Sequence, residues 1–190
     1  MPIDLQKEFL ELLMELVQSD IQTSYMSAAL KTTRTLSNVS VLFPFKFLGL
    51  KDYEVMEQEI VLNDKCVVIP TWKPRSLTYL FGNVKKNGYI KNLCETYGYY
   101  IPALNLVFIV NGRHRLATSI MAKKECTAMV EVYDFVERPN IDVYRHYGHI
   151  FWASLNEAGE RIDSVEMMDV RFAILWQLYV ALTDLSLSRE

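Results

Sequence analysis

The residues best suited to chemistry lie in one short stretch that follows an apolar segment. Residues 104–110 are almost entirely apolar, and residues 111–115 then read Asn-Gly-Arg-His-Arg. A buried strand that ends at a glycine and leads into a helix presents free backbone amides, and such amides favour a bound anion. Guanidinium groups can bind phosphate oxygens through paired hydrogen bonds. The stretch therefore predicts a phosphate-binding loop.

Each residue of this loop has an expected role. Arg113 and Arg115 would neutralise phosphate charge, and His114 would donate a hydrogen bond or a proton. Asn111 and Gly112 would also bind the phosphate, and Gly112 would let the backbone approach it. Cations in the first turn of a helix interact unfavourably with its dipole, by a fraction of about 1 kcal/mol each, and a bound anion would offset this. The alternative is that both arginines pair with carboxylates elsewhere and Gly112 only makes the turn.

Composition limits the classes of function. The chain has 190 residues, of which 23% are charged and 51% hydrophobic, the balance of a globular protein. Its formal net charge is −3. A protein that coats nucleic acid is expected to be basic, because its affinity comes from neutralising phosphates. Any contact with DNA is therefore expected to be local.

The sequence gives no firm metal site. Cys66, Cys94 and Cys126 are far apart and odd in number, so they are interpreted as reduced core thiols of a cytosolic protein. Carboxylates after the loop have the oxygens that Mg²⁺ prefers, but an ordinary surface position at a strand end explains each of them better, and none is assigned as a ligand. These carboxylates are Glu131, Asp134, Glu137 and Asp142.

No apolar run reaches the ~20 residues that a membrane-spanning helix needs. The charged start of the chain does not resemble a signal peptide. We therefore expect a cytoplasmic protein without membrane insertion.

The elements that must position the loop predict a mixed α/β fold in a single domain, residues 1–190. Helices are expected over residues 5–17, 21–35, 75–86 and 115–124. Strands are expected at 104–110 and 128–133, and a hairpin is expected at 60–69 with its turn at Asn63-Asp64. A core at 55–135 would carry helical extensions at 1–50 and 140–190. In the second extension, Asp163-Ser164-Val165-Glu166 has the spacing of a capping box.

Two motifs together resemble the ParB/sulfiredoxin superfamily. Residues 112–117, Gly-Arg-His-Arg-Leu-Ala, resemble its second signature, and residues 69–76, Ile-Pro-Thr-Trp-Lys-Pro-Arg-Ser, resemble its first. The resemblance implies a mixed sheet of about four or five strands within residues 55–135. It also implies that Lys73, Arg75 and Ser76 lie beside the loop around one nucleotide pocket.

Departures from the two best-known branches exclude their activities. Arg113 stands where sulfiredoxins have their catalytic cysteine, which excludes reduction of sulfinic acids. The same position is a glutamate in ParB proteins, and no helix-turn-helix is evident after residue 140, which argues against a centromere-binding ParB.

Within the superfamily, the sequence is most similar to the plasmid oncogenic suppression proteins, which are fertility inhibitors. That resemblance implies ATP hydrolysis with Mg²⁺, and a DNase activity that degrades DNA in transfer at the inner face of the transfer channel. A protein of the conjugation or type IV secretion machinery would be the partner. Two rivals stay open: a non-enzymatic interaction protein that inhibits a secretion ATPase, and a nucleotide-gated DNA clamp.

Overall fold

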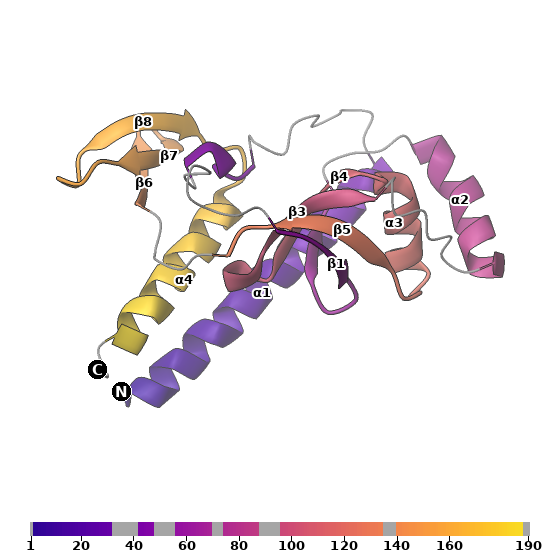
Figure 1. Cartoon of the computed structure of the whole chain (residues 1–190), viewed down its shortest axis with the longest axis horizontal. Helices are drawn as coiled ribbons and strands as arrows, with labels where there is room; N and C mark the ends of the chain where they lie inside the picture. Colours follow the sequence, from indigo (N-terminus) through magenta and orange to yellow (C-terminus); the bar gives the residue numbers. More distant parts are fainter. Residues whose placement is uncertain are drawn as a thin grey trace. The chain divides into compact units, whose positions relative to one another are not determined.

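A computed structural model describes residues 2–31, 42–47, 56–69, 74–87, 96–134 and 140–187. The mixed α/β fold is confirmed, with helices and two separate sheets in the described part of the chain (Figure 1). The helices are α1 (Ile3–Lys31), α2 (Pro74–Asn87), α3 (Arg113–Met121) and α4 (Val170–Leu187), with 3-10 turns η2 (Phe45–Phe47) and η4 (Pro102–Leu104). The first sheet contains β1 (Met56–Val61), β2 (Cys66–Val68), β3 (Tyr97–Ile101), β4 (Leu106–Asn111) and β5 (Thr127–Val132). The second contains β6 (Ile141–His146), β7 (His149–Leu155) and β8 (Arg161–Glu166).

The chain forms two compact units. One unit holds the five-stranded sheet, α2, α3 and the part of α1 from Asp20 onward. The other holds the three-stranded sheet, α4, η2 and the part of α1 up to Ser19. Two shorter helices were expected over residues 5–17 and 21–35, but the described residues form one helix through Lys31. Ser19 and Asp20 do not break it, and residues 32–35 lie outside the described part.

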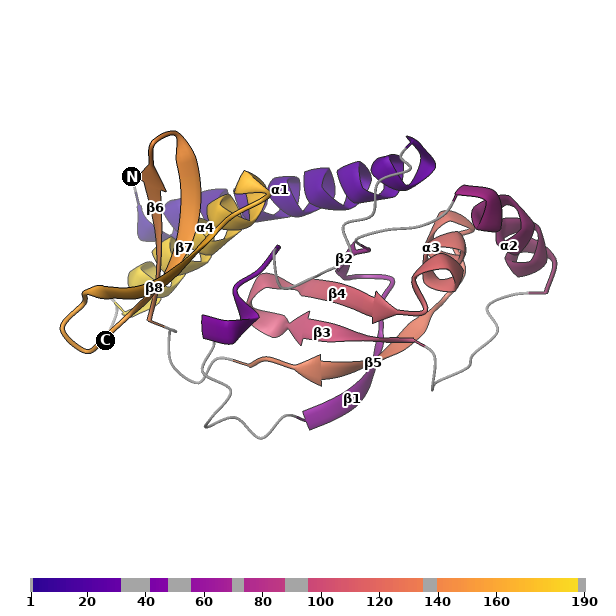
Figure 2. The ribbon, with the colours of Figure 1, turned by 90° about the horizontal axis from the view of Figure 1, so that it is seen from above.

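The five-stranded sheet has the order β1-β5-β3-β4-β2, as Figure 2 shows, which confirms the predicted mixed sheet within residues 55–135. Two pairs are parallel, β2 with β4 and β3 with β5, and the other two are antiparallel. Alternate residues of these strands face α3, where they pack with Leu116 and Ala117. On the opposite face, the Cys66 side chain contacts the backbone of Gln22, so α1 covers that side near β2. The strands that carry the loop are therefore covered on both faces there.

The hairpin predicted at residues 60–69 is wrong. β1 pairs with β5 and β2 pairs with β4, so the two strands flanking Asn63 are at opposite edges of the sheet. The Asn63 side chain explains why. Its Oδ1 accepts a hydrogen bond from the Cys126 amide at 3.1 Å, and its Nδ2 donates to the Lys124 carbonyl at 3.3 Å. These bonds attach the turn at Asn63 to residues 124–126, which directly precede β5. The turn therefore does not pair β1 with β2 in a hairpin.

The predictions close to the loop are confirmed. β4 is buried over its first four residues, and α2 ends at Asn87 as expected. β5 forms where a strand was predicted, and α3 begins at Arg113, two residues earlier than expected. None of the described helices has the length and apolar run that crossing a bilayer would take.

The prediction of a helical extension over residues 140–190 is wrong for its first half. Residues 141–166 form the antiparallel order β6-β7-β8, and Asp163-Ser164-Val165-Glu166 lies within β8 instead of capping a helix. Only α4 is helical in the described part of this region. Trp152 on β7 is buried and packs against Phe43 beside η2 and against α4. Its ring centroid lies 5.4 Å from that of Phe43 and 6.2 Å from that of Trp176, and both tryptophans are core residues.

Candidate functional site

The candidate site is the turn between β4 and α3. The last residue of β4 is Asn111, and Gly112 adopts a left-handed conformation with φ of 75° before the helix starts at Arg113. Left-handed backbone is disfavoured for residues with a Cβ atom, so this sharp turn requires glycine or a tolerant substitute. Gly112 occupies the N-cap position and has no side chain with which to cap the helix N-terminus. The strand-glycine-helix geometry expected from the sequence is therefore present.

The first turn of α3 is cationic. It contains Arg113, His114 and Arg115, and it has no acidic residue. All three side chains are partly buried. Burial lowers the pKa of the Arg113 guanidinium, because desolvation disfavours the charged form. An anion held at this turn would offset that cost.

Hydrogen bonds fix the geometry of the turn. The Nε–H of Arg113 donates to the Val110 carbonyl at 2.8 Å, which holds its guanidinium group beside the end of β4. The Gly112 amide donates to the Asn111 side chain at 2.9 Å, and the Gly112 carbonyl accepts the Leu116 amide at 3.1 Å. Arg113 therefore makes a structural contact that the sequence did not reveal. This contact is additional to its expected role of neutralising phosphate charge.

The first motif reaches the same edge of the sheet. β2 runs parallel to β4, with Val68 opposite Phe108, so the chain leaves both strands at their shared carboxyl end. The helices that follow these strands, α2 and α3, pack side by side (Figure 1). Arg75 and Ser76 lie in the first turn of α2, but their side chains, like the whole of Lys73, lie outside the described residues. That the three side chains share a pocket with the loop stays a prediction.

The carboxylates considered as metal ligands have other partners where they are described. Glu131 accepts hydrogen bonds from the hydroxyls of Tyr97 and Tyr133. Asp142 forms an ion pair with Arg161 at 2.7 Å. Asp134 is exposed, and Glu137 lies outside the described residues. Within the described ranges, no three histidine, cysteine, aspartate or glutamate side chains gather as a metal site would need.

Sequence reasoning missed the tyrosine cluster around Glu131. Tyr99 lies edge-on to Tyr97 and to Tyr133, with ring centroids 6.1 and 5.6 Å apart. Burial and the neighbouring Glu131 carboxylate raise the pKa of Tyr133, so its hydroxyl is a stable hydrogen-bond donor. The cluster was missed because β3 was not predicted, although the alternation of Tyr97 and Tyr99 was a usable signal.

The cysteines behave as core thiols where they are described. Cys66 and Cys126 are buried and free of disulfides. Burial raises the pKa of Cys66 to about 12 and that of Cys126 to about 11. Neither thiol is an effective nucleophile near neutral pH, because the thiolate is the reactive form. Cys94 lies outside the described residues.

The aromatic segment at residues 144–149 forms the β6–β7 hairpin. Tyr144 stacks on Phe151 with ring centroids 5.4 Å apart, and the Arg161 guanidinium lies 4.0 Å from the centre of the Tyr144 ring. His149 is hydrogen-bonded to Glu166 at 2.5 Å. Arg161 and His149 therefore each have an acidic partner, Asp142 and Glu166.

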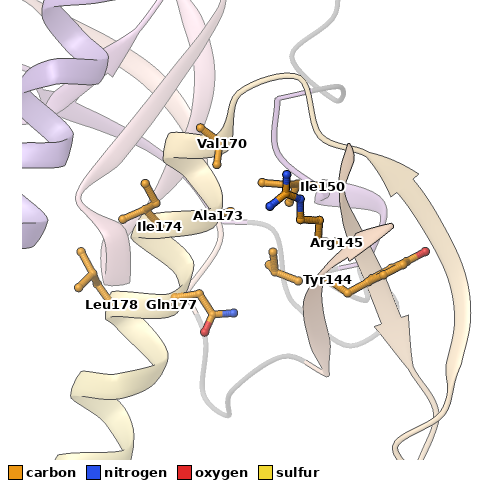
Figure 3. A pocket seen from close by; sticks show the side chains of 9 residues that line it. Tyr144, Arg145, Ile150, Val170, Ala173, Ile174, Gln177 and Leu178 are labelled. Carbon is orange, nitrogen blue, oxygen red and sulfur yellow. The ribbon is translucent and has the colours of Figure 1, made fainter. Parts of the chain in front are cut away.

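A cavity of about 440 Å³ lies between this hairpin and α4 (Figure 3). Its walls are mainly apolar, with Val143 and Ile150 contributed by the sheet and Ala173 by α4. The lining residues that carry polar groups are Tyr144, Arg145 and Gln177. The volume falls within the range of small-ligand sites, but the walls supply no nucleophile or acid–base pair for chemistry.

Comparison with known proteins gives a single result. The model of a family of unknown function, DUF6710, matches residues 2–189. No curated protein and no solved structure matches the chain.

Proposed function

We propose that this chain, which belongs to the DUF6710 family of unknown function, binds nucleotide phosphates at the β4–α3 turn and promotes phosphoryl transfer there. One observation carries the proposal. Two arginines and a histidine, with no acidic residue, occupy the first turn of a helix that follows a left-handed glycine at the end of a buried strand. Phosphoryl transfer needs mainly positioning and charge stabilisation, which such a turn can supply.

The roles follow from the geometry of the turn. Gly112 brings the backbone close to a bound phosphate, and Arg115 supplies a guanidinium group one turn into the helix. Arg113 is held at the end of β4 by its bond to Val110, so its charge is fixed in place before a ligand arrives. His114 would donate a hydrogen bond or proton to the transferred group. ATP is the expected nucleotide, and Mg²⁺ would enter with its phosphates.

The broader proposal follows the resemblance to the oncogenic suppression proteins. In it, nucleotide hydrolysis accompanies cleavage of DNA in transfer, in the cytoplasm at the inner face of a transfer channel. The partner would be a protein of the conjugation or type IV secretion machinery. The net charge of −3 is compatible with a local DNA contact at the cationic turn, not with a general coating of DNA.

The test is nucleotide titration and phosphate release with Mg²⁺, with and without plasmid or single-stranded DNA. We expect Arg115→Ala to weaken nucleotide binding by about 1.5–3 kcal/mol, roughly 10- to 150-fold, because it removes a charge-assisted hydrogen bond. Phosphate release and DNA cleavage should fall with it. Arg145→Ala is the matched control, since Arg145 is an exposed arginine in the other unit.

Stability separates a functional arginine from a structural one. Removing a cation from a helix N-terminus relieves an unfavourable dipole interaction, so Arg115→Ala should melt close to wild type. An arginine buried against a carboxylate would instead leave an unpaired charge, at roughly 3–5 kcal/mol of stability. A variant that melts much earlier yet binds nucleotide normally would refute the proposed role.

A non-enzymatic interaction protein is the second candidate. The bond from Arg113 to Val110 is compatible with it, because the bond gives one cation of the turn a structural use that needs no ligand. Wild-type protein that neither binds nucleotide nor releases phosphate would support this candidate over the first.

A further inference from the structure

The first half of α1 carries an apolar stripe that faces solvent. The side chains of Leu5, Phe9, Leu12 and Leu16 are 50, 54, 53 and 67% exposed. Their spacings of four, three and four residues place them on one side of the helix, in the pattern of a coiled-coil seam. Leu5, Phe9 and Leu12 with Glu8 also line a groove of about 370 Å³.

This stripe is not the face that folds the helix onto its own unit. A second set of apolar side chains is partly buried and points to another side of the helix: Leu10, Leu13, Met14 and Val17. The helix is therefore apolar on two sides, and only one of them is used within the described chain. Contiguous exposed apolar side chains usually mark a surface that binds something.

Acidic residues line one flank of the stripe. At 100° per residue, Glu8 and Glu15 follow the seam directly on one side, with Asp4 and Glu11 beyond them. The single basic residue up to Ser19 is Lys7, and it forms an ion pair with Glu11 at 3.8 Å. Four carboxylates against one ammonium give this surface a negative charge. Within the described residues 3–19, the other side of the seam carries no basic residue.

The acidic flank decides between possible occupants. A second copy packed antiparallel would place its acidic flank against the same flank of the first copy, which is unfavourable, and a parallel copy would set that flank against the uncharged side of its own seam and leave the carboxylates without a cation. An anionic membrane surface would repel the flank as well. An amphipathic helix with lysine or arginine beside its apolar seam fits both features. It would bury the four apolar side chains and meet Glu8 and Glu15 with opposite charge.

We propose that the stripe Leu5, Phe9, Leu12 and Leu16 is a docking surface for a basic amphipathic helix of a partner protein. The surface is independent of the β4–α3 turn. Arg115→Ala should therefore leave docking unchanged, and failure of the nucleotide proposal would not affect it.

Two synthetic helical peptides with the same leucine seam test the proposal on the full chain. One peptide has lysines beside the seam and the other has glutamates, and binding is measured by fluorescence anisotropy. We expect the lysine peptide to bind at least tenfold more tightly. Leu12→Gln combined with Leu16→Gln should abolish that binding without lowering the melting temperature, because both side chains are largely exposed.

Charge reversal on the protein gives the sharper test. Glu8→Lys combined with Glu15→Lys should reverse the preference, so that the glutamate peptide binds more tightly. The matched control is Glu125→Lys combined with Glu157→Lys, two exposed positions away from α1 that change the net charge equally. The control should keep the preference for the lysine peptide.

Three results would overturn the proposal. The first is equal or absent binding of the two peptides. The second is an unchanged preference after the Glu8/Glu15 reversal. The third is a dimer in sedimentation equilibrium that Leu12→Gln with Leu16→Gln dissolves, since a second copy would then occupy the stripe. Binding to phosphatidylserine vesicles in preference to the lysine peptide would equally exclude a basic helix.

Discussion

The two sheets of this protein are assembled in opposite ways. In the three-stranded sheet, each strand pairs with the next strand along the chain, β6 with β7 and β7 with β8. In the five-stranded sheet, only β3 and β4 are neighbours both in sequence and in space. The first sheet depends on its turns, whereas the second depends on contacts between distant segments. Substitutions at those distant contacts should therefore cost more than substitutions at the turns.

The largest effect is expected at Gly98, where β3 approaches β4 closely. A Cβ atom on Gly98 would lie 2.4 Å from the Phe108 carbonyl oxygen, and backbone cannot move away as a flexible side chain can. We expect Gly98→Ala to lower the free energy of unfolding by about 3 kcal/mol. Chemical denaturation followed by circular dichroism measures the change.

Gly82→Ala is the control within the same unit. A Cβ atom there would meet no heavy atom within 4 Å, and Gly82 lies inside α2. Alanine should therefore stabilise the helix, by roughly 0.5–1 kcal/mol. If Gly98→Ala were as harmless as Gly82→Ala, the close approach of β3 and β4 would not hold in solution.

The contrast between local pairing and contacts of distant segments also explains which elements the sequence could predict. α2, α3, β4 and β5 have strong local patterns, and all four were expected near their observed bounds. β3 was missed, because Tyr-Gly-Tyr-Tyr-Ile contains a strand-breaking glycine that only the approach to Phe108 explains. The pairing of β1 and β2 was wrong, because the local turn signal says nothing about Cys126, which is 63 residues further along the chain.

The three-stranded sheet was missed for a different reason. Charged and apolar residues are mixed without a regular period in β6 and β8, and the strongly apolar α4 that follows them dominated the pattern. At the candidate site, the glycine turn and the cationic first turn were predicted from local sequence. The bond from Arg113 to Val110 was not, because a side chain's choice between a ligand and its own backbone depends on the folded geometry.

The second-largest effect on stability is expected at a turn that an asparagine side chain holds in each sheet, at Asn63 and at Asn156. Asn63→Ala leaves the Cys126 amide without its side-chain acceptor, in the five-stranded sheet. We expect a loss of about 1–2 kcal/mol, the cost of an unsatisfied, partly buried donor. Asn156→Ala removes the acceptor for the Glu160 amide in the β7–β8 turn, but water reaches that exposed amide, so the loss should be about 0.5 kcal/mol. Equal losses in parallel denaturation experiments would contradict the contrast between the sheets.

Alkaline pH should weaken the five-stranded unit through its buried thiols. The pKa of Cys66 is raised from 9.0 to about 12, so above pH 9 the unfolded thiol loses its proton while the folded thiol keeps it. The unfolded state then binds fewer protons, and stability falls as pH rises from about 9 towards 12. At pH 10 the cost is about 1 kcal/mol for this thiol. Cys126 should act in the same direction, between pH 9 and about 11.

Comparison with Cys66→Ala separates the contribution of this thiol to the alkaline loss of stability from that of other groups that titrate above pH 9. The variant loses stability at every pH because it leaves a small cavity, but its decrease between pH 8 and pH 10 should be smaller than that of wild type by about 1 kcal/mol. Urea denaturation at the two pH values gives both differences. An identical decrease in the two proteins would mean that the Cys66 thiol is not buried in solution.

The smallest effect is a gain of stability at the turn of the β6–β7 hairpin. Tyr147 and Gly148 both have positive φ, 45° and 86°, which is the requirement of a two-residue type I′ turn. Tyrosine is strained in that conformation, whereas asparagine tolerates it and is preferred at this position. Tyr147 is 91% exposed, so little packing is lost beyond its contact with the His146 ring at 4.2 Å. Tyr147→Asn should therefore raise the free energy of unfolding by about 0.5 kcal/mol, seen as a higher melting temperature. A lower melting temperature would show that the His146–Tyr147 contact outweighs the backbone strain, and that side-chain contacts also determine this locally paired sheet.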